Sequence, residues 1–398
     1  MALRDFAAMT NVGMQRKHNQ DNMLILEKAS LIAVADGMGG LQDGEVASAT
    51  AMSVVKSAQT PLIQLAQTVD SGTGSDGRIQ LARTLDVLAH LASEKIQEVT
   101  GGTQSGTTMV AGMVANDHFL IAHVGDSRAY LYRSGTLRCL TEDHSVAASQ
   151  LRAGTISQEQ HDNSPYQHML YQALGTAGSV DPDILDVNLA DGDILLLCSD
   201  GLTGPVKEPE LLALLSDNSD LKKTASRLIN TANDNGGPDN ITVVLARASA
   251  ANCAETVDSY ESAIRKCGAL NSLTENQFLV LSLYLDTVIV PEGDEINTLR
   301  GLYILLDGSV SSFGHEIAAG QCFGLKDFCM LHDTDAEMAN SPELTDNTGT
   351  KSAIAKSDAV LALLRPAAFL SLKTRRPSLA VPIMQGLLQE MAKGYEGP

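Results

Sequence analysis

The chain has 398 residues, of which 44% are hydrophobic and 19% are charged, and 28 basic against 48 acidic residues give a net charge of -20. This composition supports a folded core, excludes a disordered polymer and, at this length, predicts one to three domains. The acidic balance disfavours unaided binding to nucleic acid or to an anionic membrane surface. Cations and basic surfaces are therefore the expected partners.

The cysteines and the first residues bear on the compartment. The six cysteines include no Cys-x-x-Cys pair, so neither a zinc knuckle nor a thioredoxin-type redox pair is predicted. Arg4 and Asp5 are followed by no apolar leader, and nothing later approaches ~20 consecutive apolar residues. We therefore expect a cytoplasmic protein that is neither exported nor membrane-spanning.

The first 248 residues alternate short apolar runs with Gly, Asn and Asp, which is typical of many strands with a few helices between them. Strands are expected at 31–35, 108–114, 118–124, 129–133, 194–198 and 241–246, and helices at 45–55, 81–99, 208–215 and 221–232. The strands between 108 and 133 are joined by short turns, which predicts an antiparallel meander. Asp191-Gly192-Asp193 predicts a plain turn before a strand.

Residues 249–398 have a different pattern of polar, apolar and glycine residues. Residues 249–270 are polar and rich in small side chains, which predicts a connector. Over 271–398, glycines separate short strands at 288–290, 302–306 and 310–313, with helices at 274–285, 366–372 and 379–393, so a small β-roll with helices is expected. The segment 333–350 holds five acids and no base, which predicts a mobile, solvated loop.

Four aspartates share one sequence context. Asp36, Asp126, Asp200 and Asp239 each occupy a Gly- or Asn-containing turn beside an apolar, strand-like run. Any one of them alone would most often be an ordinary turn residue. Clustered together with Asp21, however, five carboxylates would repel one another and take up protons unless cations were bound. All-oxygen ligation favours Mg²⁺ or Mn²⁺.

Seven segments occur in a fixed order: Arg16-x-x-Asn19-Gln20-Asp21, Asp36-Gly37-Met38-Gly39-Gly40, Ser105-Gly106-Thr107-Thr108, Gly125-Asp126-Ser127-Arg128, Asp143-His144-Ser145, Ser199-Asp200-Gly201-Leu202 and Asp239-Asn240-Ile241-Thr242. Their order and spacing resemble the motifs of the metal-dependent, type-2C protein phosphatases. The resemblance covers residues 1–248 and implies an α+β fold, an α-β-β-α sandwich of two antiparallel sheets flanked by helices. It also implies a bacterial-type enzyme that cleaves phosphoserine and phosphothreonine in phosphoproteins, with a cognate kinase.

The same resemblance implies two core Mn²⁺ or Mg²⁺ ions. Asp36 would bridge both, and the carbonyl of Gly37 would bind one of them. Asp200 and Asp239 would complete the shell of that ion, while Asp21 would hold the other, directly or through water. The two cations would activate a bridging water for attack on phosphorus.

Asp126, with help from Asp200, would hold a weaker third ion. The guanidinium of Arg16 would bind the substrate phosphate through two oxygens at once. A solvated loop arginine beside Lys17 is the alternative for Arg16. By this resemblance, Arg16, Asp36, Asp200 and Asp239 carry the catalysis.

The sequence departs from the family pattern in three places. Met38 stands where animal relatives have a histidine, and methionine cannot donate a proton, so a metal-bound water is the first candidate for the general acid and His144 a weaker one. Gln20 stands where an acidic residue is usual. In the expected flap, residues 145–174, Tyr166-Gln167-His168 occupies a region that usually carries an arginine.

Residues 271–398 are similar to the cyclic-nucleotide-binding fold in Pro291-Glu292-Gly293-Asp294 and Ala319-Gly320-Gln321-Cys322-Phe323-Gly324. The glutamate that would bind the ribose is replaced by Leu325, and no arginine follows until Arg365, with only Lys351 near the expected place. Cyclic nucleotide is therefore not an expected ligand. We expect instead that this part of the chain regulates or localises the protein, or that it forms a homodimer. Hydrolysis of small phosphomonoesters and a catalytically silent signalling module remain the alternatives for the whole chain.

Overall fold

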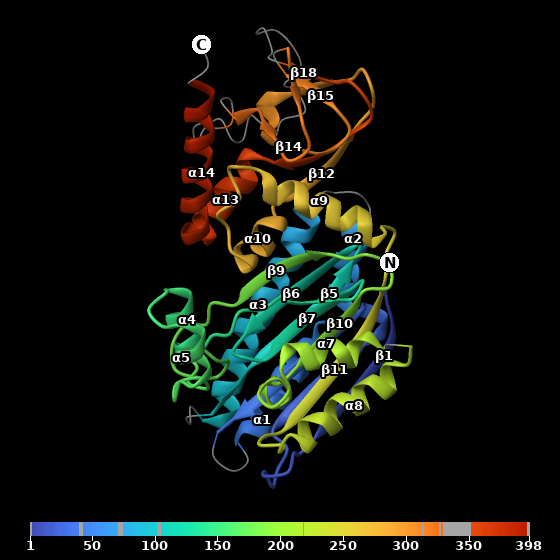
Figure 1. Cartoon of the computed structure of the whole chain (residues 1–398). Helices are drawn as coiled ribbons and strands as arrows, with labels where there is room; N and C mark the ends of the chain where they lie inside the picture. Colours follow the sequence, from blue (N-terminus) through green and yellow to red (C-terminus); the bar gives the residue numbers. More distant parts are fainter. Residues whose placement is uncertain are drawn as a thin grey trace. The chain divides into compact units, whose positions relative to one another are not determined.

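The computed structural model describes residues 2–39, 43–70, 75–101, 105–217, 219–312, 314–325, 328 and 352–395 (Figure 1). The chain divides into two compact units, Met1–Ala254 and Glu255–Pro398. The loop predicted at 333–350 and Lys351 lie outside the described residues. Within the described ranges, no helix combines the length and the apolar character needed to cross a membrane.

A six-stranded antiparallel sheet with helices on it forms one part of the first unit. The strand order is β2-β3-β5-β6-β9, and β4 pairs with β3. The strands are β2 (Asp21–Leu26), β3 (Leu31–Met38), β4 (Gly106–Thr107), β5 (Met109–Ala115), β6 (His118–Val124) and β9 (Asp183–Asn188), and a 3-10 turn (Glu27–Ala29) joins β2 to β3. Helix α1 contacts β2 and β3, α2 contacts β5, and α3 contacts β6 and β9. These helices are α1 (Asp43–Ser57), α2 (Gln59–Asp70) and α3 (Ser75–Thr100).

A five-stranded antiparallel sheet forms the other part, in the order β1-β11-β10-β7-β8. Its strands are β1 (Ala2–Asn11), β7 (Arg128–Arg133), β8 (Thr136–Cys139), β10 (Ile194–Cys198) and β11 (Ile241–Ser249). Helix α8 contacts β1 and β11, and α7 contacts β8. The helices of this part are α4 (Val146–Arg152), α5 (Gln158–Asp162), α6 (Asp200–Thr203), α7 (Glu208–Ser216) and α8 (Leu221–Asp234).

The two sheets pack against each other, since β3 contacts both β10 and β11. Strands β5 and β10 are buried along their whole length. A strand with another layer on each of its faces needs apolar residues at every position, which explains why these segments are continuous apolar runs rather than alternating ones. The prediction of antiparallel sheets combined with helices is confirmed.

The prediction of a meander over 108–133 is wrong for its last strand. Strands β5 and β6 pair as expected, but β6 pairs next with β9, and β7 pairs with β8 and β10 in the other sheet. The chain changes sheets at Gly125, whose φ of 107° lies in the region that favours glycine. This crossing places Asp126 between the two sheets.

The second unit contains two four-stranded antiparallel sheets, β12-β19-β14-β17 and β13-β18-β15-β16. The strands are β12 (Leu285–Val290), β13 (Glu295–Asn297), β14 (Leu302–Asp307), β15 (Val310–Ser312), β16 (His315–Ile317), β17 (Cys322–Phe323), β18 (Ser352–Ala355) and β19 (Ala359–Leu364), with a 3-10 turn at Thr298–Arg300. The helices are α9 (Ala254–Lys266), α10 (Glu275–Ser282), α13 (Pro366–Arg375) and α14 (Pro377–Tyr395). A β-rich unit is thus present, and its classification as a roll stays a prediction.

The segment 249–270, predicted as a connector, contains helix α9. Val257 and Ile264 of this helix are buried, but Glu261 is buried between them. The acidic residue interrupts the apolar spacing that would have marked a helix in the sequence.

Candidate metal centre and active site

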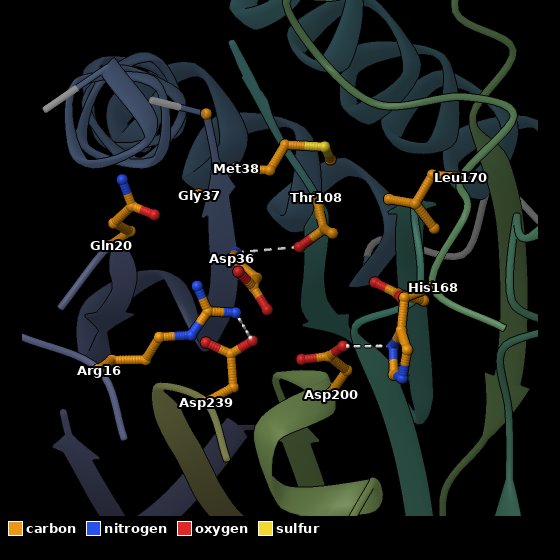
Figure 2. A pocket seen from close by; sticks show the side chains of 12 residues that line it. Arg16, Gln20, Asp36, Gly37, Met38, Thr108, His168, Leu170, Asp200 and Asp239 are labelled. Carbon is orange, nitrogen blue, oxygen red and sulfur yellow. Dashed lines mark hydrogen bonds and ion pairs between the residues drawn. The ribbon is translucent and has the colours of Figure 1, made fainter. Parts of the chain in front are cut away.

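A polar pocket opens where the ends of several strands meet (Figure 2). Most of its lining belongs to the motifs that the sequence singled out. The lining residues are Arg16, Gln20, Asp36, Gly37, Met38, Gly39, Thr108, Asp126, His168, Leu170, Asp200 and Asp239. All the predicted site residues except Asp21 thus line this pocket, and Asp21 lies opposite Asp36 in the adjoining strand.

Asp36 near the end of β3 lies at the centre of this pocket, and its backbone is held on both sides. Its N–H donates to Thr108 Oγ1 at 2.9 Å, and its carbonyl accepts from Thr107 Oγ1 at 2.8 Å. Thr108 Oγ1 also lies 2.7 Å from Ser127 Oγ, next to Asp126. The two threonines therefore fix Asp36 relative to the turn that carries Asp126, a role that the sequence analysis did not assign to them.

The carboxyl of Asp36 is buried among other acids. Burial raises its pKa well above the ordinary value, and the charges of Asp21, Asp200, Asp126 and Asp239 raise it further. Such a group ionises readily only when cations neutralise its surroundings. A raised pKa of this kind is what the sequence predicts for clustered carboxylates that bind metal ions.

Asp21 lies behind Asp36 and does not line the pocket. The two are directly opposite each other in the β2–β3 ladder. Asp21 Oδ2 accepts from Ser199 Oγ at 2.7 Å, and its Oδ1 is buried without a hydrogen-bond partner. Burial raises the pKa of Asp21 to about 6. An unpartnered buried carboxylate oxygen fits a role as a ligand, directly or through water.

Asp200 and Asp239 approach from the other sheet. Asp200 begins α6 directly after β10, and its Oδ1 is also buried without a hydrogen-bond partner. Asp239 precedes β11, and its Oδ2 accepts from Arg16 Nη2 at 2.6 Å. The predicted phosphate-binding residue is therefore present at the site, where its charge now offsets one of the carboxylates.

The side chain of Asn240 organises the loop that carries Arg16. Its Nδ2 donates to the carbonyls of Val12 and His18, both at 2.9 Å, and its Oδ1 accepts from the Gln20 N–H at 2.8 Å. One amide thus holds both ends of the loop against β11. From the sequence, Asn240 could be recognised only as part of a motif. Its role in holding the loop could not be predicted, because hydrogen bonds between residues more than 200 positions apart leave no local pattern.

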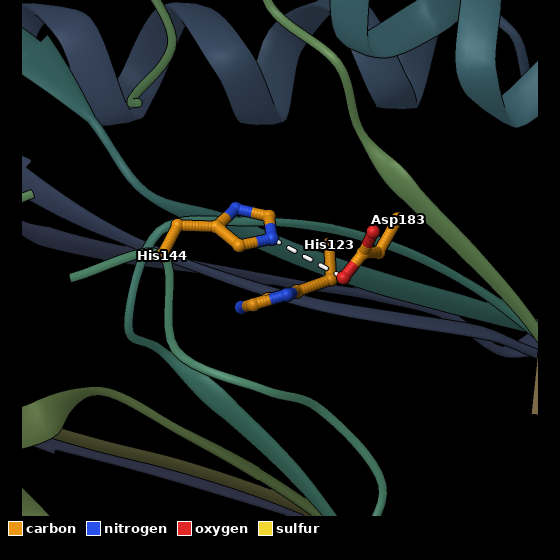
Figure 3. A group of neighbouring side chains, drawn as sticks. All are labelled: His123, His144 and Asp183. Carbon is orange, nitrogen blue, oxygen red and sulfur yellow. Dashed lines mark hydrogen bonds and ion pairs between the residues drawn. The ribbon is translucent and has the colours of Figure 1, made fainter. Parts of the chain in front are cut away.

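His144 lies outside the pocket lining, so its position does not favour a role as general acid. Figure 3 shows it beside His123 of β6 and Asp183 of β9. His144 Nε2 lies 3.2 Å from Asp183 Oδ2, and its Nδ1 accepts from the Gly125 N–H at 3.2 Å. Burial and the neighbouring His144 lower the pKa of His123 to about 3, so that ring is neutral. The imidazole of His144 supports the turn that precedes Asp126.

Comparison with known proteins adds independent evidence. The family model described as protein phosphatase 2C matches residues 14–246. The chain belongs to the protein phosphatase 2C family. It is a serine/threonine protein phosphatase, and such phosphatases use Mn²⁺ or Mg²⁺.

Two curated relatives are similar over the first unit. The serine/threonine phosphatase stp of Listeria welshimeri is 40% identical over 239 residues, which cover 59% of this chain and 92% of the relative. The protein phosphatase PhpP of Streptococcus pneumoniae is 31% identical over 248 residues, covering 61% of this chain and 96% of the relative.

Two solved structures share the fold of this part. One is the serine/threonine phosphatase PstP of Mycobacterium tuberculosis, with a TM-score of 0.54 and 30% identity over 63% of this chain and 100% of that one. The other is a catalytic domain of PstP in complex with two manganese ions, with a TM-score of 0.51 and 31% identity over 62% of this chain and 97% of that one. None of these relatives or structures supports the predicted likeness of the second unit to cyclic-nucleotide-binding domains.

Proposed function

We propose that this pocket hydrolyses phosphoserine and phosphothreonine in proteins and that its metal ligands are those expected from the sequence. They are Asp21, Asp36, the Gly37 carbonyl, Asp126, Asp200 and Asp239. The observation that carries the proposal is the gathering of Asp36, Asp126, Asp200 and Asp239 in one pocket, with Asp21 opposite Asp36 in the adjoining strand. A donor set made of carboxylate and carbonyl oxygens suits Mn²⁺ or Mg²⁺.

Gly37 supports this assignment by its surroundings. A Cβ at this position would overlap the carbonyl of Gly44 in α1, and the Gly37 N–H donates to the Gln20 carbonyl at 3.2 Å. Only glycine lets the backbone pass this closely. Its own carbonyl stays available to an ion beside Asp36.

When bound, the divalent ions would lower the pKa of water and offset charge that develops on the phosphoryl oxygens. Arg16 would then exchange Asp239 for the substrate, because bound cations neutralise that carboxylate and leave the guanidinium free to bind two phosphate oxygens. Met38 cannot donate a proton and His144 does not line the pocket, so solvent is the proposed source of the proton for the leaving alkoxide.

The test is turnover of a phosphothreonine peptide with Mn²⁺ compared with EDTA, and with a sugar phosphate as the competing substrate. We expect rapid, Mn²⁺-dependent release of phosphate from the peptide and much slower release from the sugar phosphate. Equal rates on both substrates would favour a small-molecule phosphomonoesterase. No turnover of either would favour a catalytically silent signalling module.

The raised pKa of Asp21 makes stabilisation by metal pH-dependent. Because its pKa is about 6 in the folded chain against an ordinary 3.8, the metal-free fold binds this proton more tightly than the unfolded chain does. The metal-free protein therefore loses stability as the pH rises from about 4 to about 6. Divalent ions bind the deprotonated site.

Mn²⁺ should increase the Tm of the full chain at both pH values. We expect this increase to be at least about twice as large near pH 7.5 as near pH 5. Thermal unfolding with Mn²⁺ and with EDTA at the two pH values measures this difference. Equal increments at both would contradict the proposed role of the buried acids.

For the second unit we propose regulation or homodimerisation without cyclic nucleotide. Leu325 cannot accept a hydrogen bond from a ribose hydroxyl, and Arg365 Nε lies 2.7 Å from Asp286 Oδ2 in an ion pair. Unlike Asp239, Asp286 is not a proposed metal ligand, so nothing in this account frees the Arg365 guanidinium for a phosphate. A partner kinase that phosphorylates the substrates completes the proposal.

We predict that cAMP and cGMP show no micromolar binding to the full chain in calorimetric titration. Saturable heat at micromolar concentrations would overturn this account of Leu325. The oligomeric state, measured by light scattering, tests the homodimer separately.

A further inference from the structure

His168 from the flap brings an imidazole to the acidic side of the pocket (Figure 2). Its Nδ1–H donates to Asp200 Oδ2 at 3.1 Å. One ligand-capable atom from each of Asp126, His168 and Asp200 lies within 4.8 Å of the other two. The pair of carboxylates assigned above to a weaker third ion therefore has a nitrogen donor beside it.

The two carboxylates need a partner at this position. Asp126 is only 8% exposed, and within the described residues no hydrogen bond reaches its carboxylate. Asp200 uses Oδ2 for His168, while its Oδ1 is buried without a hydrogen-bond partner. A buried oxygen such as Asp200 Oδ1 is normally satisfied, and a cation shared with the Asp126 carboxylate would satisfy it.

The backbone of the flap holds His168 near Asp126. Leu170 forms a β-bridge with Ser145, and the Val146 N–H donates to the Met169 carbonyl at 2.8 Å. His144, which directly precedes Ser145, donates its N–H to the carbonyl of Gly125 at 2.8 Å. The chain directly after His168 is thus linked through a few hydrogen bonds to the turn that carries Asp126.

A salt bridge also links the chain just after Asp126 to the residue that precedes His144. Arg128, two residues after Asp126, binds both oxygens of Asp143 at 2.8 Å. Asp143 precedes His144 directly. A fork-to-fork pair of this kind restricts both position and orientation. The approach of His168 to Asp126 and Asp200 therefore belongs to a built arrangement, although the imidazole itself is 68% exposed.

We infer that His168 is a side-chain ligand of the cation held by Asp126 and Asp200, and that it ties the flap to that ion. The inference rests on the proposed function, because it concerns the third ion of the same pocket. Binding of the cation would displace the Nδ1 proton to solvent, which leaves a neutral imidazole with its proton on Nε2 and the Nδ1 lone pair directed at the ion.

A nitrogen donor changes which ion the site prefers. Carboxylates and water suit Mg²⁺ and Mn²⁺, whereas imidazole suits later transition metals better than Mg²⁺. This third site is therefore selective for Mn²⁺ over Mg²⁺, more so than a site with oxygen ligands alone. Asp21, Asp36, Asp200 and Asp239 would hold the core ions. His168 is not among those ligands, so the core sites should persist without it.

The test is an Mn²⁺ titration of the full chain, with free Mn²⁺ measured by electron paramagnetic resonance. The variants are His168→Ala and, as the matched control, Gln167→Ala on the same flap. Gln167 uses its backbone N–H for Ser164, which the substitution keeps. We expect two tight sites in all three proteins and a weak third site whose Mn²⁺ affinity falls ~10-fold or more in His168→Ala only. Competition with Mg²⁺ should show a smaller change.

A second measurement reports on the ligand itself. In crystals of the full chain soaked with Mn²⁺ at the concentration that fills the third site, an anomalous peak should lie within bonding distance of His168 Nδ1, Asp126 and Asp200. A third site of unchanged or higher Mn²⁺ affinity in His168→Ala would overturn the inference while the tight sites uphold the proposed function. The absence of tight sites in the unmodified chain would overturn both.

Discussion

Asp36→Asn is expected to lower kcat/KM for Mn²⁺-dependent hydrolysis of a phosphothreonine peptide by about 1000-fold or more. The substitution keeps the size and removes the charge of the residue that four other acids surround. A neutral amide cannot bridge two divalent ions, so the loss is in the chemistry and not in the fold. Asp239→Asn should also lower kcat/KM, because it removes a charged oxygen ligand beside Asp36 that a divalent ion needs.

Asp191→Asn is the matched control for these variants. Its side chain is 55% exposed in the same unit and is not part of the pocket lining. We expect unchanged turnover for this variant and a native circular dichroism spectrum for all three. A normal rate in Asp36→Asn or in Asp239→Asn would refute the role assigned to that residue.

The largest expected effect on stability is at Asp193, in a turn that the sequence predicted to be ordinary. Its oxygens accept from Arg133 Nε at 2.9 Å and Nη2 at 2.6 Å, and both side chains are buried. Asp193 Oδ2 also accepts from the Ala190 N–H at 2.8 Å. Asp193→Ala would leave a guanidinium buried without its charge partner, which costs about 3–5 kcal/mol of the free energy of unfolding.

Asp191→Ala, two residues away, separates the effect of burial from that of charge. Asp191 pairs with Arg4 at 3.5 Å on the surface, and such pairs contribute about 0–1 kcal/mol. Because the chain has no tryptophan, urea unfolding is best followed by far-ultraviolet circular dichroism. Similar midpoints for the two variants would contradict the structural role given to Asp193.

The layered part of the fold could be predicted because its strands and helices carry strong apolar patterns. The pairing of the strands could not, as β6 and β7 show. The apolar residues of β6 and β7 predict that each segment is a strand. Which sheet each strand joins depends on the left-handed turn at Gly125 and on partner strands far along the chain. Non-local pairing of this kind has no local signal.

The site could be predicted as a group because each acid lies at or beside the end of a strand-like run, where a sheet can gather such residues. What holds the group was beyond the sequence. Thr107 and Thr108 fix Asp36, and Asn240 fixes the loop of Arg16, each through hydrogen bonds between distant segments. The sequence marked His168 only as part of a departure from the family pattern, since its approach to Asp200 depends on how the flap folds.

The most direct measurement is anomalous diffraction at the manganese edge from crystals of the full chain grown with Mn²⁺. The account predicts two strong peaks beside Asp36, within bonding distance of oxygens from Asp200, Asp239 and, directly or through water, Asp21. Manganese peaks located elsewhere, or none at this pocket, would contradict it.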